Sequence, residues 1–143
     1  MFRVNILAKV LQEIALVAQK PYEQIGLLIG NLKDGELWIT DVVHGEGDSS
    51  SSVTMLSPLR IARVADDILS GRLQGRIVGW YHSHIGSGVF MSDIDAETQL
   101  RLQQFSPYVV GLVIDSLKNE FGLFIYDALL GPVQIPQSYI RIV

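Results

Sequence analysis

The sequence contains no cysteine, and this absence removes several kinds of chemistry. The chain can form no disulfide, use no thiolate nucleophile and build no cysteine-based zinc site. Any metal ion must therefore be held by histidine and carboxylate side chains. The chain has 3 histidines and 15 acidic residues from which such a site could be built.

Charged residues are scarce as well, because Lys, Arg, Asp and Glu together make up only 18% of the chain. The net charge is −4 and the 11 basic residues are scattered, whereas a nucleic-acid-binding surface needs a basic cluster. We therefore expect no nucleic-acid partner. Hydrophobic residues make up 48% of the 143 residues, which is enough for one packed core and too few residues for two, so residues 1–143 are expected to form a single domain.

Long apolar runs are missing too. The first twenty residues, MFRVNILAKVLQEIALVAQK, resemble a signal peptide in their apolar content, but Lys9, Glu13 and Lys20 interrupt the apolar residues and no small-residue cleavage site follows. No stretch approaches the length of a membrane span. A cytoplasmic protein without a membrane partner is the default expectation.

The first half of the chain predicts two helices and a hairpin. Apolar residues at helical spacing predict a helix over residues 4–19, which ends at Lys20-Pro21. Short apolar runs predict a hairpin of strands 24–30 and 37–43, and residues 45–52 (GEGDSSSS) predict a polar loop. A second helix is expected to begin after Ser57 as N-cap and to end at Gly71. Its expected buried stripe consists of Ile61, Ala65, Ile68 and Leu69.

The second half predicts a buried strand over residues 77–84 that ends in polar residues, and a third helix over 92–104. Strands are expected at 108–115 and 120–127, followed by a last strand in the tail, broken by Pro136. This alternation is typical of an α/β fold in which helices pack on a central sheet.

The strand over residues 77–84 ends in two histidines, His82 and His84. Residues two apart on a strand project from the same face, so both imidazoles can converge on one metal ion. This pair alone is weak evidence, because two partly exposed or hydrogen-bonded histidines would give the same pattern. His44 lies outside this pattern and is interpreted as a surface or loop histidine.

Asp95 adds a third candidate ligand within fourteen positions of His82. Two imidazoles and one carboxylate leave the fourth position of a tetrahedral zinc ion open for water, which is the catalytic arrangement. An alternative stays open at this point. Ser92 and Asp95 are three residues apart at the start of a predicted helix, and such a pair can simply form a capping box.

The string His82-Ser83-His84, seven residues, Ser92, two residues, Asp95 is similar to the signature of the JAMM (MPN-plus) metalloproteases. That family also has a glutamate before an apolar Gly-Leu strand, and Glu23 stands in that place in the segment PYEQIGLLIG (residues 21–30). The segments 77–84 and 109–117 resemble those of the same family. The resemblance extends over nearly the whole chain. One departure is Ile85, where the family commonly has proline.

The resemblance implies a central, curved, mixed β-sheet flanked by helices. It implies that His82, His84 and Asp95 bind one zinc ion per chain, that Glu23 transfers protons and that Ser92 stabilises the oxyanion. These roles are chemically sensible, because zinc lowers the pKa of its bound water to about 7 and a hydroxyl donor stabilises charge that develops on the carbonyl oxygen. Ser83 should point to the opposite face of the strand and have a structural role.

The implied reaction is zinc-dependent hydrolysis of the bond after the C-terminal Gly-Gly of ubiquitin or a ubiquitin-like modifier, with a homodimer or a proteasome-like assembly as a further expectation. Two alternatives stay open: a hydrolase that processes a small sulfur-carrier protein, and a non-catalytic MPN scaffold. Trp80 and Phe90 flank the site, and core packing is the expected role of both.

Overall fold

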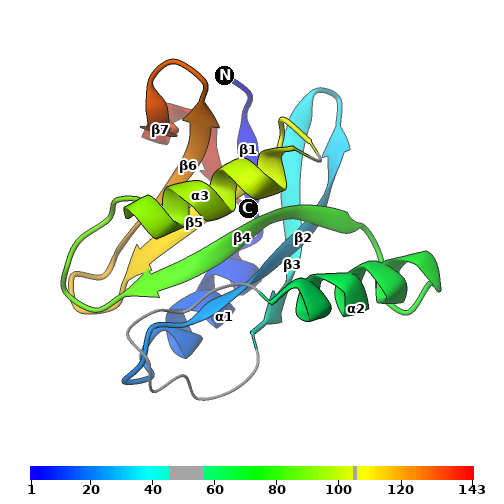
Figure 1. Ribbon diagram of the computed structural model, residues 1–143, viewed down its shortest axis with the longest axis horizontal. Helices are drawn as coiled ribbons and strands as arrows, with labels where there is room; N and C mark the ends of the chain where they lie inside the picture. The colour runs from blue at the N-terminus through cyan, green and yellow to red at the C-terminus, as the bar shows by residue number, and fades with distance from the viewer. Residues whose placement is uncertain (46–56, 105) are drawn as a thin grey trace.

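The computed structural model describes residues 1–45, 57–104 and 106–143 (Figure 1). The first half of the chain forms β1 Val4–Ile6, α1 Ala8–Val17, β2 Ile25–Lys33, β3 Glu36–His44 and α2 Pro58–Leu69. The second half forms β4 Arg76–His84, α3 Asp93–Gln103, β5 Val110–Asp115, β6 Glu120–Asp127, β7 Gly131–Gln134, a 3-10 turn at Gln137–Tyr139, and β8 Ile140–Ile142. No helix among the described residues is long and apolar enough to cross a membrane.

All eight strands belong to one sheet in the order β7-β6-β5-β4-β2-β3-β1-β8. The pairs β4·β5, β1·β3 and β1·β8 are parallel, and the other neighbours are antiparallel. The prediction of a mixed sheet with flanking helices is therefore confirmed.

The sheet is strongly curled, as the position of its two edges shows. β7 and β8 are the edge strands, yet residues 135–139 alone connect them. Eight flat strands would place the edges about 34 Å apart, whereas a connection of this length reaches only about 20 Å. The two edges must therefore approach each other, and Ile135 of this connection is buried in the core between them.

Helices cover both faces of the sheet (Figure 1). Neighbouring residues of β2 show this division, because alternate side chains of a strand point to opposite faces. Leu28 packs in the cluster that contains α1, while Leu27 packs in the cluster that contains Val64 of α2 and Leu102 of α3. The face covered by α2 and α3 is the one that carries the candidate site.

The hairpin of β2 and β3 is confirmed, and its turn is tighter than the sequence suggested. Asp34 and Gly35 both have positive φ values, 54° and 75°, between the paired residues Lys33 and Glu36. An Asp-Gly pair in this conformation forms the two-residue turn whose twist matches that of the strands. The loop predicted at 45–52 lies outside the described residues, apart from Gly45.

The predicted helix over residues 4–19 is wrong at its beginning. Val4–Ile6 form strand β1, and α1 starts only at Ala8. The apolar residues at helical spacing begin at Leu7, so the predicted helix extends three residues before the pattern that supports it. The strand conformation of Val4–Ile6 depends on β3 and β8, which lie far away in the sequence.

The second helix begins and ends close to the predicted bounds, and its predicted stripe is correct in part, because Ile61 and Ile68 pack against the core cluster. Val64 is its buried residue, whereas Leu69, at the C-terminal end of the helix, is 87% exposed. Ser57 occupies the N-cap position without a side-chain capping hydrogen bond. The tail is divided as expected near Pro136, and its two pieces, β7 and β8, belong to opposite edges of the sheet.

Candidate metal centre

The end of β4 brings His82 and His84 to one face of the sheet. β4 is an interior strand, paired with β2 on one side and β5 on the other, so its backbone is held along its length. Both histidines are buried, and their ring centroids lie 5.2 Å apart. The two-residue spacing therefore places both imidazoles on one face of the strand, as the sequence predicts.

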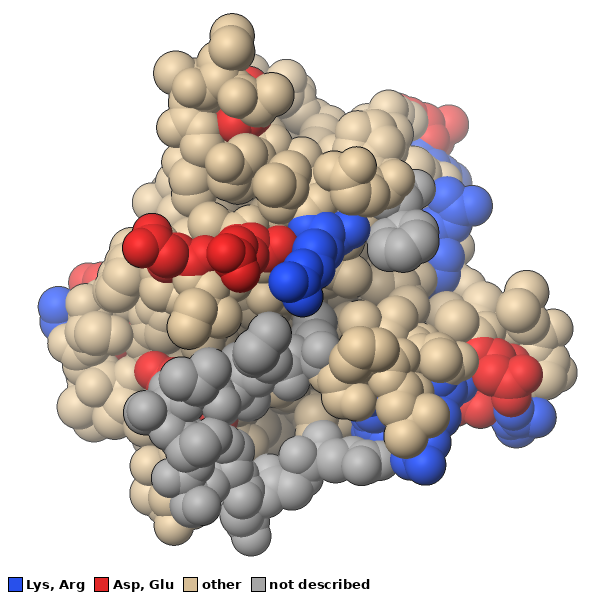
Figure 2. Space-filling view, viewed as in Figure 1, with Lys and Arg blue, Asp and Glu red and all other residues tan. Residues whose placement is uncertain are grey.

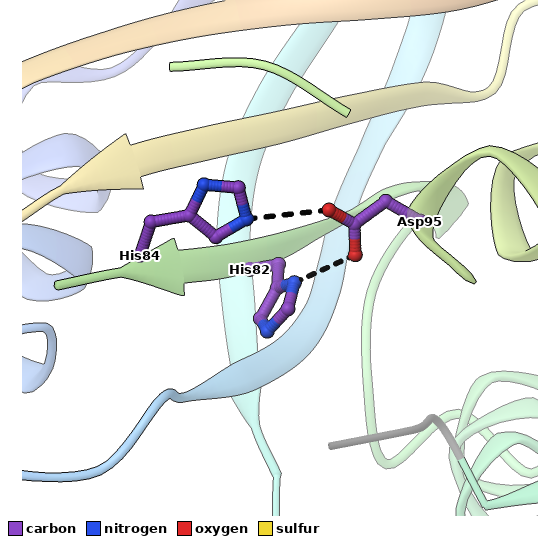
Figure 3. Close-up of side chains that lie close together, drawn as sticks. All are labelled: His82, His84 and Asp95. Carbon is purple, nitrogen blue, oxygen red and sulfur yellow. Dashed lines mark hydrogen bonds and ion pairs between the residues drawn. The ribbon is translucent and has the colours of Figure 1, made fainter. Parts of the chain in front are cut away.

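Asp95 reaches the two histidines from the N-terminus of α3 (Figure 3). Its Oδ1 lies 2.8 Å from His82 Nδ1, and its Oδ2 lies 3.3 Å from His84 Nε2. The opposite face of α3 carries the exposed charged residues Asp93, Glu97 and Arg101, and Figure 2 shows acidic and basic side chains along this helix. The helix is thus oriented with its charged face toward solvent and Asp95 toward the sheet.

Ser92 and Asp95 also form the capping box that the sequence left open as an alternative. Ser92 Oγ accepts a hydrogen bond from the Asp95 backbone N–H at 3.1 Å, and Asp95 Oδ2 accepts one from the Ser92 backbone N–H at 3.1 Å. The cap and the histidine contacts coexist, because a carboxylate has several lone pairs. The capping box is therefore part of what orients Asp95.

His82, His84 and Asp95 have the geometry of a metal site. One ligand atom from each residue can be chosen so that all three lie within 4.8 Å of one another. His82 Nε2 is buried and makes no hydrogen bond. Apart from the carboxylate of Glu23 at 3.3 Å, no partner among the described residues satisfies this nitrogen, and a buried nitrogen of this kind is costly unless an ion or another partner completes its contacts. Two imidazoles and one carboxylate also match the donor set of zinc, so the residues present fit a zinc ion.

A hydrogen bond orients the ring of His84. Its Nδ1 lies 2.8 Å from the carbonyl oxygen of Gly88. A carbonyl only accepts, so Nδ1 carries the proton, and in the neutral ring Nε2 presents its lone pair toward Asp95. Histidines that bind metal ions commonly donate their other N–H in this way.

The electrostatics of the cluster favour a cation between these groups. Burial would raise the pKa of Asp95, but hydrogen bonds from His82, His84 and the Ser92 backbone outweigh it and hold that pKa well below its usual range. Burial would lower the pKa of His84, but hydrogen bonds to Asp95 and to the Gly88 carbonyl outweigh it and raise that pKa. Asp95 is therefore ionised at neutral pH, and its buried negative charge favours a cation beside it.

Glu23 lies beside this cluster, just before β2. Its Oε2 is 3.3 Å from His82 Nε2. The neighbouring backbone is fixed to β4, because Ser83 Oγ accepts a hydrogen bond from the Gln24 N–H at 2.6 Å and the Ser83 N–H donates to the Gln24 carbonyl at 2.9 Å. Ser83 thus points away from the metal cluster and ties the Glu23 segment to the strand that carries the histidines.

The structure brings together the five residues singled out in the sequence: Glu23, His82, His84, Ser92 and Asp95. Trp80 is buried, as expected, and its indole N–H donates to Gln99. The prediction of core packing is wrong for Phe90. Its side chain is 44% exposed, and its ring lies 4.9 Å from that of His84.

The interpretation of His44 as a surface or loop histidine is correct in part, because its side chain is 33% exposed and lies 3.4 Å from the exposed carboxylate of Glu13, but it does not lie in a loop. It ends strand β3, and its Nδ1 lies 2.7 Å from the Tyr81 hydroxyl. Tyr81 is buried on the other face of β4, and burial raises the pKa of its hydroxyl. Tyr81 belongs to the core cluster on the α1 side of the sheet, so the pair is separate from the metal cluster.

Two supporting residues were missed by sequence reasoning. Gln99, one turn after Asp95, accepts from Trp80 and donates to the Val109 carbonyl at 2.7 Å. Asp115, at the end of β5, accepts backbone hydrogen bonds from the loop that follows His84. The sequence does contain a signal for each. Gln99 is a polar residue on the inward face of a predicted helix, and Asp115 is an aspartate at the end of a buried strand.

A curled mixed sheet with two histidines at a strand end and a carboxylate at a helix start defines the class of JAB/MPN domains. The family profile described as "JAB1/Mov34/MPN/PAD-1 ubiquitin protease" matches residues 2–108. The chain belongs to this family.

Curated relatives are similar to about three quarters of the chain. The chain is 32% identical over 110 residues to the 26S proteasome non-ATPase regulatory subunit 14 of Dictyostelium discoideum, an alignment that covers 76% of this chain and 36% of the relative. It is 30% identical over 110 residues to the 26S proteasome regulatory subunit rpn11 of Schizosaccharomyces pombe, with the same coverage. It is 34% identical over 104 residues to the NAD(+) hydrolase TcpA of a Theionarchaea archaeon, covering 73% of this chain and 30% of the relative.

The chain therefore spans about a third of the length of the curated relatives that it matches. Among solved structures, protein DSY2949 from Desulfitobacterium hafniense superposes with a TM-score of 0.72 at 20% identity, covering 98% of this chain and 92% of that one. This likeness supports the fold.

Proposed function

We propose that this chain is a zinc-dependent isopeptidase that hydrolyses the bond after the C-terminal Gly-Gly of ubiquitin or a ubiquitin-like modifier. The observation that carries the proposal is the buried cluster of His82, His84 and Asp95 with the carboxylate of Glu23 at its edge. The relatives named as proteasome subunits and the family description support the substrate class. Ubiquitin-type conjugates in the cytoplasm, and an assembly with other subunits, are part of the same proposal.

His82, His84 and Asp95 would hold the zinc ion. When bound, zinc supplies Lewis-acid chemistry: it polarises a carbonyl and lowers the pKa of a coordinated water to about 7. Glu23 takes a proton from the attacking water at Oε2 and returns it to the leaving amine. Its Oε2, 3.3 Å from His82 Nε2, lies beside the ligand set, and a carboxylate in that place is a competent acid–base group.

Ser92 stabilises the oxygen on which negative charge develops. Its capping bond uses a lone pair of the hydroxyl, so the hydroxyl proton can be donated to the substrate. Such a donor is preorganised by the helix N-terminus and strengthens its interaction only as charge develops in the transition state.

The Gly86-Ser87-Gly88 segment lies beside the cluster, and the backbone of Ser87 in it can pair with an extended Gly-Gly tail by strand addition, because the N–H groups of Gly86 and Gly88 already donate to Asp115. Phe90 supports this role, since it is exposed and lies against the ring of His84. A narrow glycine tail has no side chains to collide with either group.

The test is cleavage of ubiquitin and ubiquitin-like fusions joined to a reporter after Gly-Gly, with and without a zinc chelator. We expect cleavage that the chelator abolishes and added zinc restores. Asp95→Ala should lose both zinc and cleavage, while Glu23→Gln should lose cleavage and keep zinc. A zinc-loaded protein that cleaves none of the Gly-Gly fusions would contradict the substrate class and favour a scaffold role.

A further inference from the structure

Asp115 is buried at the end of β5, and its carboxylate accepts hydrogen bonds from four backbone N–H groups. Its Oδ1 accepts from Leu117 at 3.0 Å and Lys118 at 3.1 Å, in its own turn. The same oxygen accepts from Gly86 at 3.0 Å, and Oδ2 accepts from Gly88 at 2.6 Å. Two of the four bonds therefore reach a different segment, the loop that connects β4 to α3.

This loop connects the two halves of the candidate metal site. It begins directly after His84 and ends at Ser92, the N-cap of α3. Gly86 and Gly88 have φ values of 89° and 104°, a left-handed conformation that glycine adopts without steric cost. The buried carboxylate of Asp115 holds the backbone of this loop at both of these glycines.

The carbonyl oxygen of Gly88 is the acceptor for His84 Nδ1, at 2.8 Å. The same residue thus donates its N–H to Asp115 and accepts the proton of His84. Next to Asp115, the Ser116 backbone N–H donates to the His84 carbonyl oxygen at 3.1 Å. The β5–β6 turn therefore holds both the backbone of His84 and the partner of its side chain.

We propose that Asp115 is a positioning residue for the metal site: by anchoring Gly86 and Gly88, it holds the Gly88 carbonyl against His84 Nδ1 and keeps His84 Nε2 available to the ion. The inference rests on the proposed function, since it concerns the same zinc site. Hydrogen bonds outside the ligand set fix the tautomer and orientation of a metal-binding histidine, and their loss commonly weakens metal binding about 10- to 100-fold.

A simpler role for Asp115 is to cap its own turn, and the chain contains a matched control for that role. Asp127 ends β6 as Asp115 ends β5, and its Oδ1 accepts from Leu129 at 2.8 Å and Leu130 at 2.9 Å. These are the i+2 and i+3 bonds that Asp115 makes to Leu117 and Lys118. Asp127→Asn therefore makes the same change, removal of the carboxylate charge, in a turn of the same kind away from the metal site.

The experiment compares the wild type, Asp115→Asn and Asp127→Asn in zinc affinity, measured by competition with a chromophoric chelator. We expect zinc to bind about 10- to 100-fold more weakly to Asp115→Asn, because the amide group cannot accept all the loop bonds, and with wild-type affinity to Asp127→Asn. A second measurement uses the ¹⁵N shifts of the His84 ring in zinc-free protein, at a pH where the ring is neutral. The wild type should carry its proton on Nδ1, and Asp115→Asn should show a mixture of tautomers.

Wild-type zinc affinity in folded Asp115→Asn, or an equal loss in Asp127→Asn, would overturn the inference. If the wild type itself bound no zinc, the proposed function would fail, while the His84 tautomer would still test the inference separately. If Asp115→Asn does not fold, Gly88→Ala is the deciding variant. It keeps the carboxylate but strains the loop at a φ of 104°, so it should also bind zinc weakly, and normal zinc affinity with an unchanged tautomer would reject the proposal.

Discussion

The proposed acid–base group, Glu23, contacts the metal cluster at His82, with Oε2 3.3 Å from His82 Nε2. We expect Glu23→Gln to keep zinc and the fold, because Glu23 lies outside the ligand set of His82, His84 and Asp95. Turnover should fall by about 10²-fold or more, since glutamine cannot accept and return a proton. Zinc content and kcat on the same preparation are the measurements, and near-normal turnover in the zinc-loaded variant would remove Glu23 from the proton transfer.

The hydroxyl of Ser92 has one demonstrated role, as helix cap, and one proposed role, as oxyanion donor. Losing the cap should cost about 1 kcal/mol of stability, whereas losing an oxyanion donor costs about 2.7–4 kcal/mol in the transition state. We therefore expect Ser92→Ala to melt earlier and also to lose kcat strongly, with KM little changed and zinc retained. If a folded, zinc-loaded Ser92→Ala protein turned over normally, the cap would be its whole contribution.

Helix α3 carries Asp95, and buried amide groups attach this helix to the sheet. Gln99 accepts from the Trp80 indole and donates to the carbonyl of Val109, while Gln103 exchanges hydrogen bonds with the backbone of Tyr126. Gln99 and Gln103 are themselves hydrogen-bonded at 2.9 Å. Polar contacts have a defined direction and apolar ones do not, so these bonds hold the register of α3 against β4, β5 and β6.

We predict that Gln99→Leu is destabilised by about 1–3 kcal/mol for each buried group that it leaves unsatisfied, the Trp80 N–H and the Val109 carbonyl among them. Gln104→Leu is the control, because Gln104 is an exposed amide at the C-cap of the same helix and should change stability little. Urea unfolding of both variants gives the free energies. Equal stability of Gln99→Leu and the wild type would show that apolar packing alone attaches the helix.

The elements that sequence patterns predicted best are those with strong local signals. His82 and His84 on one strand face, the capping box at Ser92 and the Asp-Gly hairpin each follow from spacings of a few residues. β1 was missed because its conformation is decided by partners more than thirty positions away. Asp115 was missed for the same reason, since its loop partners lie on the far side of α3 in the sequence.

At the scale of the whole molecule, the stability of the folded zinc-free protein depends on pH in two opposite ways, because some titrating groups have lowered pKa values and His84 has a raised pKa. Asp95, Asp115 and Asp127 have lowered pKa values, each held down by hydrogen bonds to its carboxylate. Their contribution is complete above the unfolded pKa of about 3.9 and is lost as the pH falls through the folded values. His84 has a raised pKa, so its contribution is complete below about 6.5 and is lost as the pH rises through the folded value.

We therefore predict that zinc-free protein is most stable between about pH 4 and pH 6.5 and less stable on either side. Zinc-loaded protein should lose the decline at high pH, because the metal binds neutral imidazole and replaces the proton of His84. Urea unfolding across this pH range, with and without zinc, is the measurement. A zinc-free protein whose stability is unchanged from pH 5 to pH 8 would contradict the assigned role of His84.

The pairing of β1 with β8 also has a consequence for how the chain acquires its fold. Val4 and Ile140 lie opposite each other in a parallel pair, and the Val143 carbonyl accepts from the N–H of Ala8, at the start of α1. Contacts between residues so distant in sequence are formed late, because the entropy cost of closing a large loop comes before the hydrogen bonds that offset it. During synthesis, strand β1 leaves the ribosome long before β8 exists, so the backbone groups on one edge of β1 stay unpaired until β8 is made. The pairing of β1 with β8 can form only after β8 has been synthesised, so we expect folding to be completed at this edge of β1. Until then the edge exposes unpaired backbone groups, which a chaperone could protect from aggregation.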